Sequence, residues 1–194
     1  MRAWIEMISP DVADGKLAKL YEKARTPAGT VDNVMQAHSL RPHTLDGHVA
    51  LYRAVLHHPD NTLPDWFLEA VGSYTSILNG CDYSLTHHRH NARALLGGGE
   101  TGDAALAALD NHEPEKVFEG KYLALLQYVE KLTLSPAAIA REDVEGLRAS
   151  GASDGEILET NQVCGYFNYV NRHLNGLGVS TEGDKIGYYD EPGS

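Results

Sequence analysis

Four side chains able to act as nucleophile, acid or base stand close together in the sequence: Glu69, Cys81, Ser84 and His88. The last three are spaced i, i+3 and i+7, so on an α-helix they share one face. Glu69 belongs to a preceding helical segment, and Asn79-Gly80 marks a break between the two segments. We therefore expect a carboxylate, a thiol, a hydroxyl and an imidazole to meet at one helix–helix corner.

This combination has the chemistry of an activated thiol. A cysteine at a helix N-terminus feels the partial positive charge of unpaired backbone N–H groups, and a nearby protonated histidine adds to it, so both favour the reactive thiolate. A glutamate beside His88 would hold the ring in one tautomer and pass protons on. The alternative is that Cys81 is a small core residue, as most free cysteines are. The presence of Glu69, Ser84 and His88 favours the chemical interpretation.

The spacing Glu69-x11-Cys81-x2-Ser84-x3-His88 resembles the signature of the alkylhydroperoxidase D and carboxymuconolactone decarboxylase superfamily, usually Glu-x11-Cys-x2-Cys-x3-His with Asn-Gly-Cys at the break. It is most similar to the branch of peroxidase-related enzymes. This resemblance implies a compact all-α AhpD-like domain built on an antiparallel helix pair, with no cofactor, in a homo-oligomer (dimer, trimer or hexamer). It covers most of the chain, including residues 33–42 and 165–179.

The chain departs from that signature at Ser84, which replaces the second cysteine. The local disulfide of the two-cysteine members cannot form here, and in those members the missing cysteine is often taken as the peroxidatic one. The pattern Cys81-x-Tyr83-x4-His88 is also similar to sestrins, in which a single cysteine works with a tyrosine and a histidine. That resemblance implies a role for Tyr83 in orienting a substrate; otherwise Tyr83 is a half-buried aromatic residue at a helix start.

Composition narrows the classes of function. The 194 residues suffice for one well-buried domain, and a formal net charge of −11 without any basic cluster argues against nucleic-acid binding. No apolar run approaches the roughly 18–20 residues of a membrane span, and the N-terminal segment lacks the apolar core of a signal peptide. Two cysteines do not make a disulfide framework. We expect a cytoplasmic protein without membrane contact.

The apolar pattern predicts helices throughout and no strand. Asp11 is a plausible N-cap, with Val12 turned inward, and Pro114 is expected to open a long helix. Ser153 and Glu156 form a capping box at the last helix. The predicted helices cover residues 11–25, 33–39, 42–57, 64–79, 81–96, 101–109, 114–132, 141–150 and 153–174.

We expect one AhpD-like domain over residues 1–179 and a polar tail over residues 180–194. The tail is either a frayed terminus or an arm that docks on a neighbouring subunit through Tyr188 and Tyr189. Cys164, in the last helix, is expected to be a core residue rather than a resolving thiol. A polar group in the same helix is expected to satisfy buried backbone or to meet a partner subunit: Asn168, Asn171 and Arg172.

A metal site is not predicted from the histidines. His87, His88 and His90 are not i, i+4 partners on a helix, so they point in different directions. No HExxH spacing accompanies them or the pair His57-His58.

Two classes of function follow. In the first, Cys81 attacks a small hydroperoxide and becomes a sulfenic acid, with His88 and Glu69 moving protons and an external thiol as reductant because Ser84 cannot resolve the intermediate. The same corner could instead perform acid–base chemistry on a small carbonyl or lactone, as the decarboxylase relatives imply. In the second class the protein is a non-catalytic or redox-sensing helical oligomer.

Overall fold

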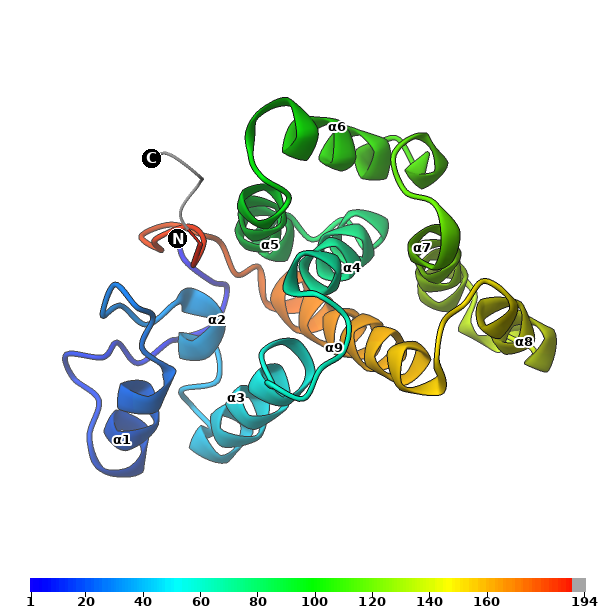
Figure 1. The fold of residues 1–194 in the computed structure, drawn as a ribbon. Coiled ribbons are helices and arrows are strands. Elements are labelled where there is room, and N and C mark those ends of the chain that lie inside the picture. The colour runs from blue at the N-terminus through cyan, green and yellow to red at the C-terminus, as the bar shows by residue number, and fades with distance from the viewer. Residues whose placement is uncertain (190–194) are drawn as a thin grey trace.

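A computed structural model describes residues 1–189, and this part of the chain is helical with no strand. Figure 1 shows how the helices are arranged around the long C-terminal helix. They are α1 (Gly15–Ala24), α2 (Asn33–Gln36), α3 (Pro42–Leu56), α4 (Asp65–Leu78), α5 (Asp82–Leu95), α6 (Gly99–Asp110), α7 (Gly120–Leu134), α8 (Arg141–Ala149) and α9 (Asp154–Leu177), with 3₁₀ turns at Pro114–Lys116 and Pro136–Ala138.

Helices α4 and α5 form the hairpin that the sequence predicts, and both pack against neighbouring helices of the bundle. α4 also contacts α7 and α9, while α3 and α7 contact α9. Pro64 stands before the first turn of α4, where a missing N–H costs nothing, and Gly80 ends the corner with a φ of 58°. The backbone N–H of Cys81 then donates to the Ser76 carbonyl at 2.9 Å, which closes the corner.

Small residues let α4 and α9 approach closely. A Cβ added at Gly72 would lie 2.4 Å from ring atoms of Phe167, so only glycine fits beside that ring. The Phe167 ring also meets the His88 ring edge-on, with centroids 4.6 Å apart. Glycine at this position therefore fixes the distance between α4 and α9 and, through Phe167, the place of His88.

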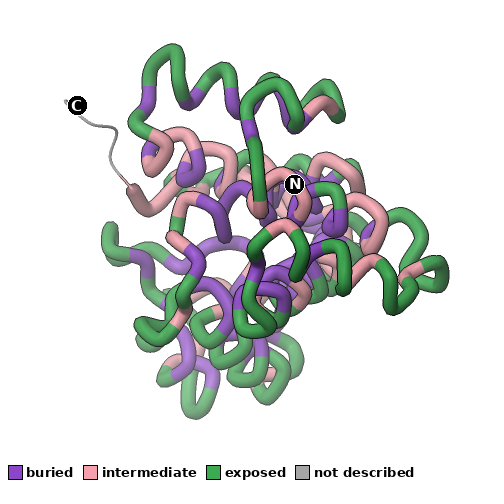
Figure 2. Tube along the Cα trace, turned by 45° about the vertical axis from the view of Figure 1, so that its right-hand side comes forward, coloured by how far each residue is buried: buried purple, intermediate pink, exposed green. Residues whose placement is uncertain are grey.

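The core follows the apolar faces of the central helices, and buried positions run along the middle of the molecule in Figure 2. Phe67, Val71 and Tyr74 of α4 are fully buried, as their three- and four-residue spacing predicts. Full burial of a side chain such as that of Phe67 is worth about 1.5–3 kcal/mol. A second, smaller apolar cluster joins α1 to α3.

Two predicted helix starts are wrong. Asp11 lies in a turn, α1 begins at Gly15 after Asp14, and Val12 is 69% exposed because it precedes the amphipathic segment. Pro114 opens only a 3₁₀ turn, and α7 begins at Gly120, whose φ of 55° breaks the helical path between them. The capping box of Ser153 and Glu156 is confirmed at the start of α9.

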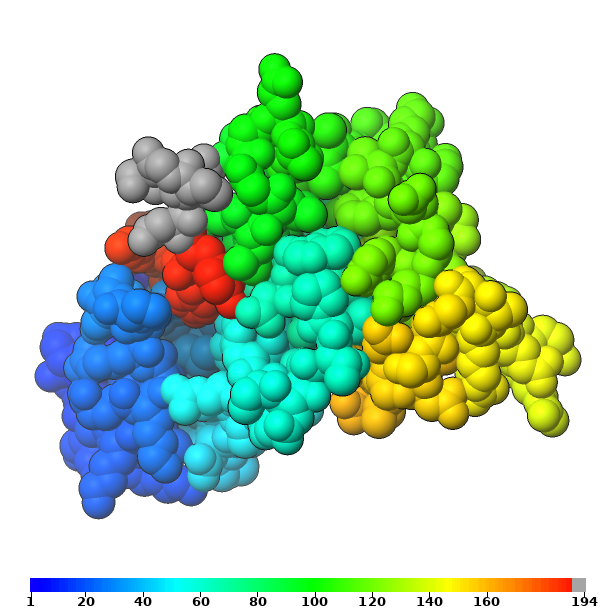
Figure 3. Space-filling model, in the orientation of Figure 1, coloured from blue at the N-terminus to red at the C-terminus, as the bar shows by residue number. Residues whose placement is uncertain are grey.

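The described part of the tail docks on its own chain, so residues 180–189 do not form a frayed end. The Asp184 carboxylate accepts from the backbone N–H of Asn33 at 3.0 Å, and the Tyr188 hydroxyl donates to Asp32 at 2.7 Å. In Figure 3 this segment fills the space between the N-terminal helices and α5. Residues 190–194 of the predicted tail lie outside the described residues.

Candidate functional site

The site is built on a carboxylate–imidazole pair that joins α4 to α5. Glu69 is 2% exposed, and its Oε2 accepts from Nδ1 of His88 at 2.7 Å. Its Oε1 accepts from Nδ2 of Asn91 at 3.2 Å, so both oxygens of the buried carboxylate have a donor. Such a pair holds the imidazole in the tautomer with its proton on Nδ1 and leaves Nε2 free to take or give a proton.

Cys81 stands at the N-cap of α5 but is only 1% exposed. Burial raises the pKa of its thiol, while the backbone N–H and hydroxyl of Ser84 and the side chain of Asn171 act in the opposite direction. The expectation of a thiolate favoured by the helix start is therefore wrong for the protein in this state. The loss of water around the sulfur outweighs the donors that face it.

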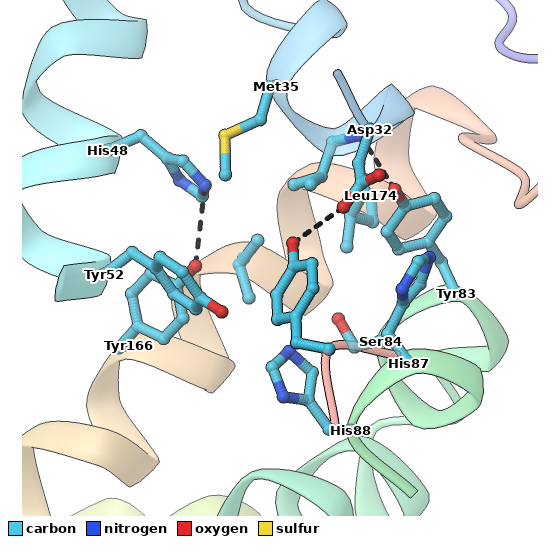
Figure 4. Close-up of a pocket in the computed structure, with 13 residues that line it drawn as sticks. Asp32, Met35, His48, Tyr52, Tyr83, Ser84, His87, His88, Tyr166 and Leu174 are labelled. Atoms are coloured by element: carbon cyan, nitrogen blue, oxygen red, sulfur yellow. Dashed lines mark hydrogen bonds between the residues drawn. The ribbon is translucent and has the colours of Figure 1, made fainter. Parts of the chain in front are cut away.

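A small cavity lies at the site. Ser84 and His88 line it, and Cys81 is not among its lining residues. Its volume is about 30 Å³. Figure 4 shows Ser84 and His88 on one side of it and His48, Tyr52 and Tyr166 on the other. Ser84 thus touches both the thiol and the cavity, and it stands where the superfamily signature has its second cysteine.

Tyr83 turns its hydroxyl towards the docked tail. The hydroxyl donates to Oδ2 of Asp184 at 2.5 Å and accepts from the backbone N–H of Val34 at 3.0 Å. Burial, followed by the negative charge of Asp184, raises the pKa of Tyr83 well above its usual value. Because both bonds are made within the protein, the hydroxyl is held as a structural anchor in this state.

The sequence did not identify several residues of the site. Asn91 follows His88 by three positions and so shares its face, a signal that could have been used. Asn171 was noted only as a polar residue, yet it is fully buried beside Cys81, and its Nδ2 donates to the Ser76 hydroxyl at 3.2 Å. Asp184 and Tyr188 come from an irregular segment whose sequence carries no helical pattern, and the sequence indicated Tyr188 only as a possible contact to a neighbouring subunit.

Cys164 lies in the core, as expected, and apart from the site. It is fully buried, and burial raises the pKa of its thiol. Its sulfur lies 3.3 Å from Oγ1 of Thr133 and accepts from Nδ2 of Asn168 at 3.4 Å. The two cysteines are both free.

A second group of histidines lies on the far side of the cavity. The His38 ring stacks on that of His173 with centroids 4.3 Å apart, and lies 4.7 Å from that of His48. Burial lowers the pKa of His38 to about 3 and that of His48 to about 4, and it also lowers the pKa of His173. These imidazoles are therefore neutral at physiological pH.

Within residues 1–189, no group of three or more histidine, cysteine or acidic side chains has an arrangement that could hold a metal ion. None of the helices described combines the length and apolar character needed to cross a bilayer.

No family model matches the chain, and no curated protein matches it in sequence. Solved structures match it in fold. An alkylhydroperoxidase AhpD-core, uncharacterized peroxidase-related protein from Ralstonia eutropha JMP134 has a TM-score of 0.81 and 19% identity over 93% of each chain. An uncharacterized peroxidase-related protein from Silicibacter sp. TM1040 has a TM-score of 0.81 and 22% identity over 98% of this chain and 95% of that one.

The debrominase Bmp8 matches with a TM-score of 0.70 and 16% identity, over 94% of this chain and 92% of that one. Another structure of Bmp8 is a cysteine-to-alanine variant in complex with 2,3,4-tribromopyrrole. At these identities the likeness shows the fold. The chain therefore has the all-α AhpD-like fold of peroxidase-related proteins, and the resemblance inferred from the spacing of Glu69, Cys81, Ser84 and His88 is confirmed at that level.

Proposed function

We propose that the protein is a peroxidase-related oxidoreductase that reduces small hydroperoxides through Cys81. The observation that carries the proposal is the buried pair of Glu69 and His88, 2.7 Å apart, on the same helix corner as a cysteine whose sulfur faces hydrogen-bond donors. Structural neighbours described as peroxidase-related support the same class.

In the proposed reaction the thiol proton of Cys81 passes by way of the Ser84 hydroxyl to Nε2 of His88. The sulfur then attacks one peroxide oxygen, so that an S–O bond forms as the O–O bond breaks and sulfur is oxidised by two electrons to a sulfenic acid. His88 returns the proton to the departing oxygen, which leaves as an alcohol or as water. Glu69 stabilises the imidazolium between these steps.

The sulfenic acid needs an external reductant because Ser84 supplies no resolving thiol. One thiol molecule condenses with it to a mixed disulfide and releases water, and a second thiol molecule frees Cys81 and leaves as a disulfide. Such a cycle suits a reducing compartment, so we propose a cytoplasmic location. We also propose a homo-oligomer, a dimer, trimer or hexamer, which light scattering of the purified protein would test.

Intact-mass analysis tests the thiol step. One equivalent of hydrogen peroxide should add a single oxygen, and dimedone should trap the product at Cys81 in the parent and in the Cys164→Ser variant. The Cys81→Ser variant should give no adduct. Oxidation at Cys164 alone, or no oxidation while the protein is folded, would contradict the proposal.

A second candidate is acid–base chemistry on a small carbonyl or lactone. It is favoured by one observation: Ser84 and His88 line the cavity and Cys81 does not. The Ser84→Cys variant separates the two candidates. If peroxide chemistry is the function, a second thiol one turn from Cys81 supplies a local resolving step, and thiol-dependent turnover should rise well above that of the parent. If neither protein consumes hydroperoxide with any thiol donor, the acid–base or non-catalytic alternative is correct.

A further inference from the structure

Two hollows meet at Tyr188 of the docked tail. The inner one is the cavity beside Ser84 and His88. The outer one is a groove of about 440 Å³ between the end of α1, α3 and the tail, which is within the range of about 300–1,000 Å³ usual for small-molecule sites. Three residues line both hollows and so form the partition between them: Met35, Tyr52 and Tyr188.

The inner cavity holds polar atoms that lack a partner. Oδ1 of Asp32 and Nδ1 of His48 are buried without a hydrogen bond within the described residues, and both side chains line the cavity. Nε2 of His87, which also lines it, makes no hydrogen bond but lies 3.6 Å from Oδ2 of Asp184. A buried polar atom left unpaired costs about 1–3 kcal/mol. These atoms therefore favour a polar group, such as a peroxide or a hydroxyl, at this end.

The outer groove has the opposite character, with apolar and aromatic walls and a basic rim. Arg25 and Arg53 line it, and none of its lining residues within 1–189 is a carboxylate, in a chain whose net charge is −11. Arg25 is paired with Glu22, at 2.7 Å, but Arg53 is exposed and makes its hydrogen bond to a carbonyl, that of Lys23. Among the described residues that line the groove, Arg53 therefore presents a guanidinium without a carboxylate partner to an anion. The remaining lining residues are Ala24, Thr26, Pro27, Met35, Val49, Tyr52, His57, Tyr188 and Tyr189.

We propose that the two hollows form one binding site for an organic molecule with an apolar body and a carboxylate, entered past Tyr188. The carboxylate meets Arg53, the body lies in the groove, and the reactive end reaches Ser84 and His88. This deepens the proposed function, on which it rests for the reactive group, by naming the substrate class as carboxylate-bearing organic hydroperoxides. The cavity of about 30 Å³ admits no such molecule while the Tyr188 hydroxyl stays bonded to Asp32, so Tyr188 must move aside.

Binding of an unreactive probe tests the proposal without turnover. Titration calorimetry should show that 4-phenylbutyrate binds about fivefold more tightly than its uncharged amide, the gain expected from one partly exposed ion pair. The Arg53→Gln variant should lose this preference. The matched control Arg141→Gln, a change at an exposed arginine of α8, should keep it. Equal binding of the two probes by the parent, or an unchanged preference in Arg53→Gln, would overturn the proposal.

A second measurement tests whether Tyr188 separates the two hollows. In the Tyr188→Ala variant the probe should shift the imidazole resonances of His88, because the partition is gone, whereas the Tyr169→Ala variant, altered at an exposed tyrosine of α9, should behave as the parent. His88 resonances that stay unchanged in Tyr188→Ala at saturating probe would show that the hollows are separate. Probe binding without peroxide turnover would contradict the proposed function alone, and turnover without probe binding would contradict this inference alone.

Discussion

His88 and His48 line the same cavity from opposite sides, but only His88 has a carboxylate against its ring. Glu69 holds Nδ1 of His88 at 2.7 Å, whereas the neighbours of His48 are the rings of His38 and Tyr166 and its Nδ1 has no partner within residues 1–189. The carboxylate beside His88 fixes the tautomer and the orientation of its ring, whereas burial and a neighbouring imidazole lower the pKa of His48. One wall of the cavity is thus suited to proton transfer and the other to staying neutral.

Removing the charge of Glu69 should have the largest effect on this difference. In the Glu69→Gln variant the side-chain amide can accept from only one of the two donors, His88 and Asn91, and its NH₂ group faces the other. We expect turnover to fall by about 100-fold or more, the usual contribution of a positioned acid–base group. The measurement is the rate of peroxide consumption, with circular dichroism as the control for folding. Full activity in a folded Glu69→Gln protein would make the pair structural.

Lowering the pH should destabilise the folded protein, because the buried histidines His38 and His48 are neutral in it. The pKa values of His38 and His48 in the folded protein, about 3 and about 4, lie below the value of about 6.5 for an unfolded chain. The stability that they contribute is therefore fully present above pH 6.5 and is lost as the pH falls from there towards their folded values. Urea unfolding at pH 5 instead of pH 7 should show a loss on the order of 2 kcal/mol for each of the two.

The His48→Gln variant should reduce this dependence on pH, because one proton fewer is taken up on unfolding. The His58→Gln variant serves as the control, since the His58 side chain is 52% exposed. A pH dependence of equal slope in parent and His48→Gln would show that other groups cause the acid sensitivity.

The smallest effect is expected at Asn91, which joins the pair to the tail. Its Oδ1 accepts from the backbone N–H of Tyr188 at 2.8 Å, and its Nδ2 donates to Glu69. The Asn91→Asp variant keeps the acceptor but sets two carboxylates together, so turnover should fall about tenfold while the Tyr188 amide stays protected from hydrogen exchange. Asn91→Leu should show a similar fall in turnover and should also lose the protection of the Tyr188 amide. If the Tyr188 amide exchanges its hydrogen at the same rate in the two variants, Asn91 does not hold the tail.

The helical fold and the pairing of Glu69 with His88 were predictable because both depend on local spacing. Helical periodicity places apolar residues on one face, and Asn79-Gly80 marks the corner that brings the two side chains together. The same logic failed for the thiol. Position at the helix start indicated an activated Cys81, but burial of the sulfur in the folded protein dominates its pKa and raises it.

The histidine cluster and the docked tail were not predictable for the same reason. His38, His48 and His173 come from the turn after α2, from α3 and from α9, so no spacing in the sequence relates them. The tail is polar and irregular, and its position depends on single bonds such as that between Tyr188 and Asp32. Polar contacts between distant segments leave no periodic signal.

Gly72 gives the site a dependence on a residue that has no side chain. A methyl group there would meet the Phe167 ring at 2.4 Å, and that ring lies edge-on against His88. Any substitution would push the aromatic ring, and with it the imidazole, away from the position in which Glu69 holds it. In a mutational screen scored by activity, position 72 would therefore rank beside the residues that move protons, although glycine donates and accepts nothing through a side chain.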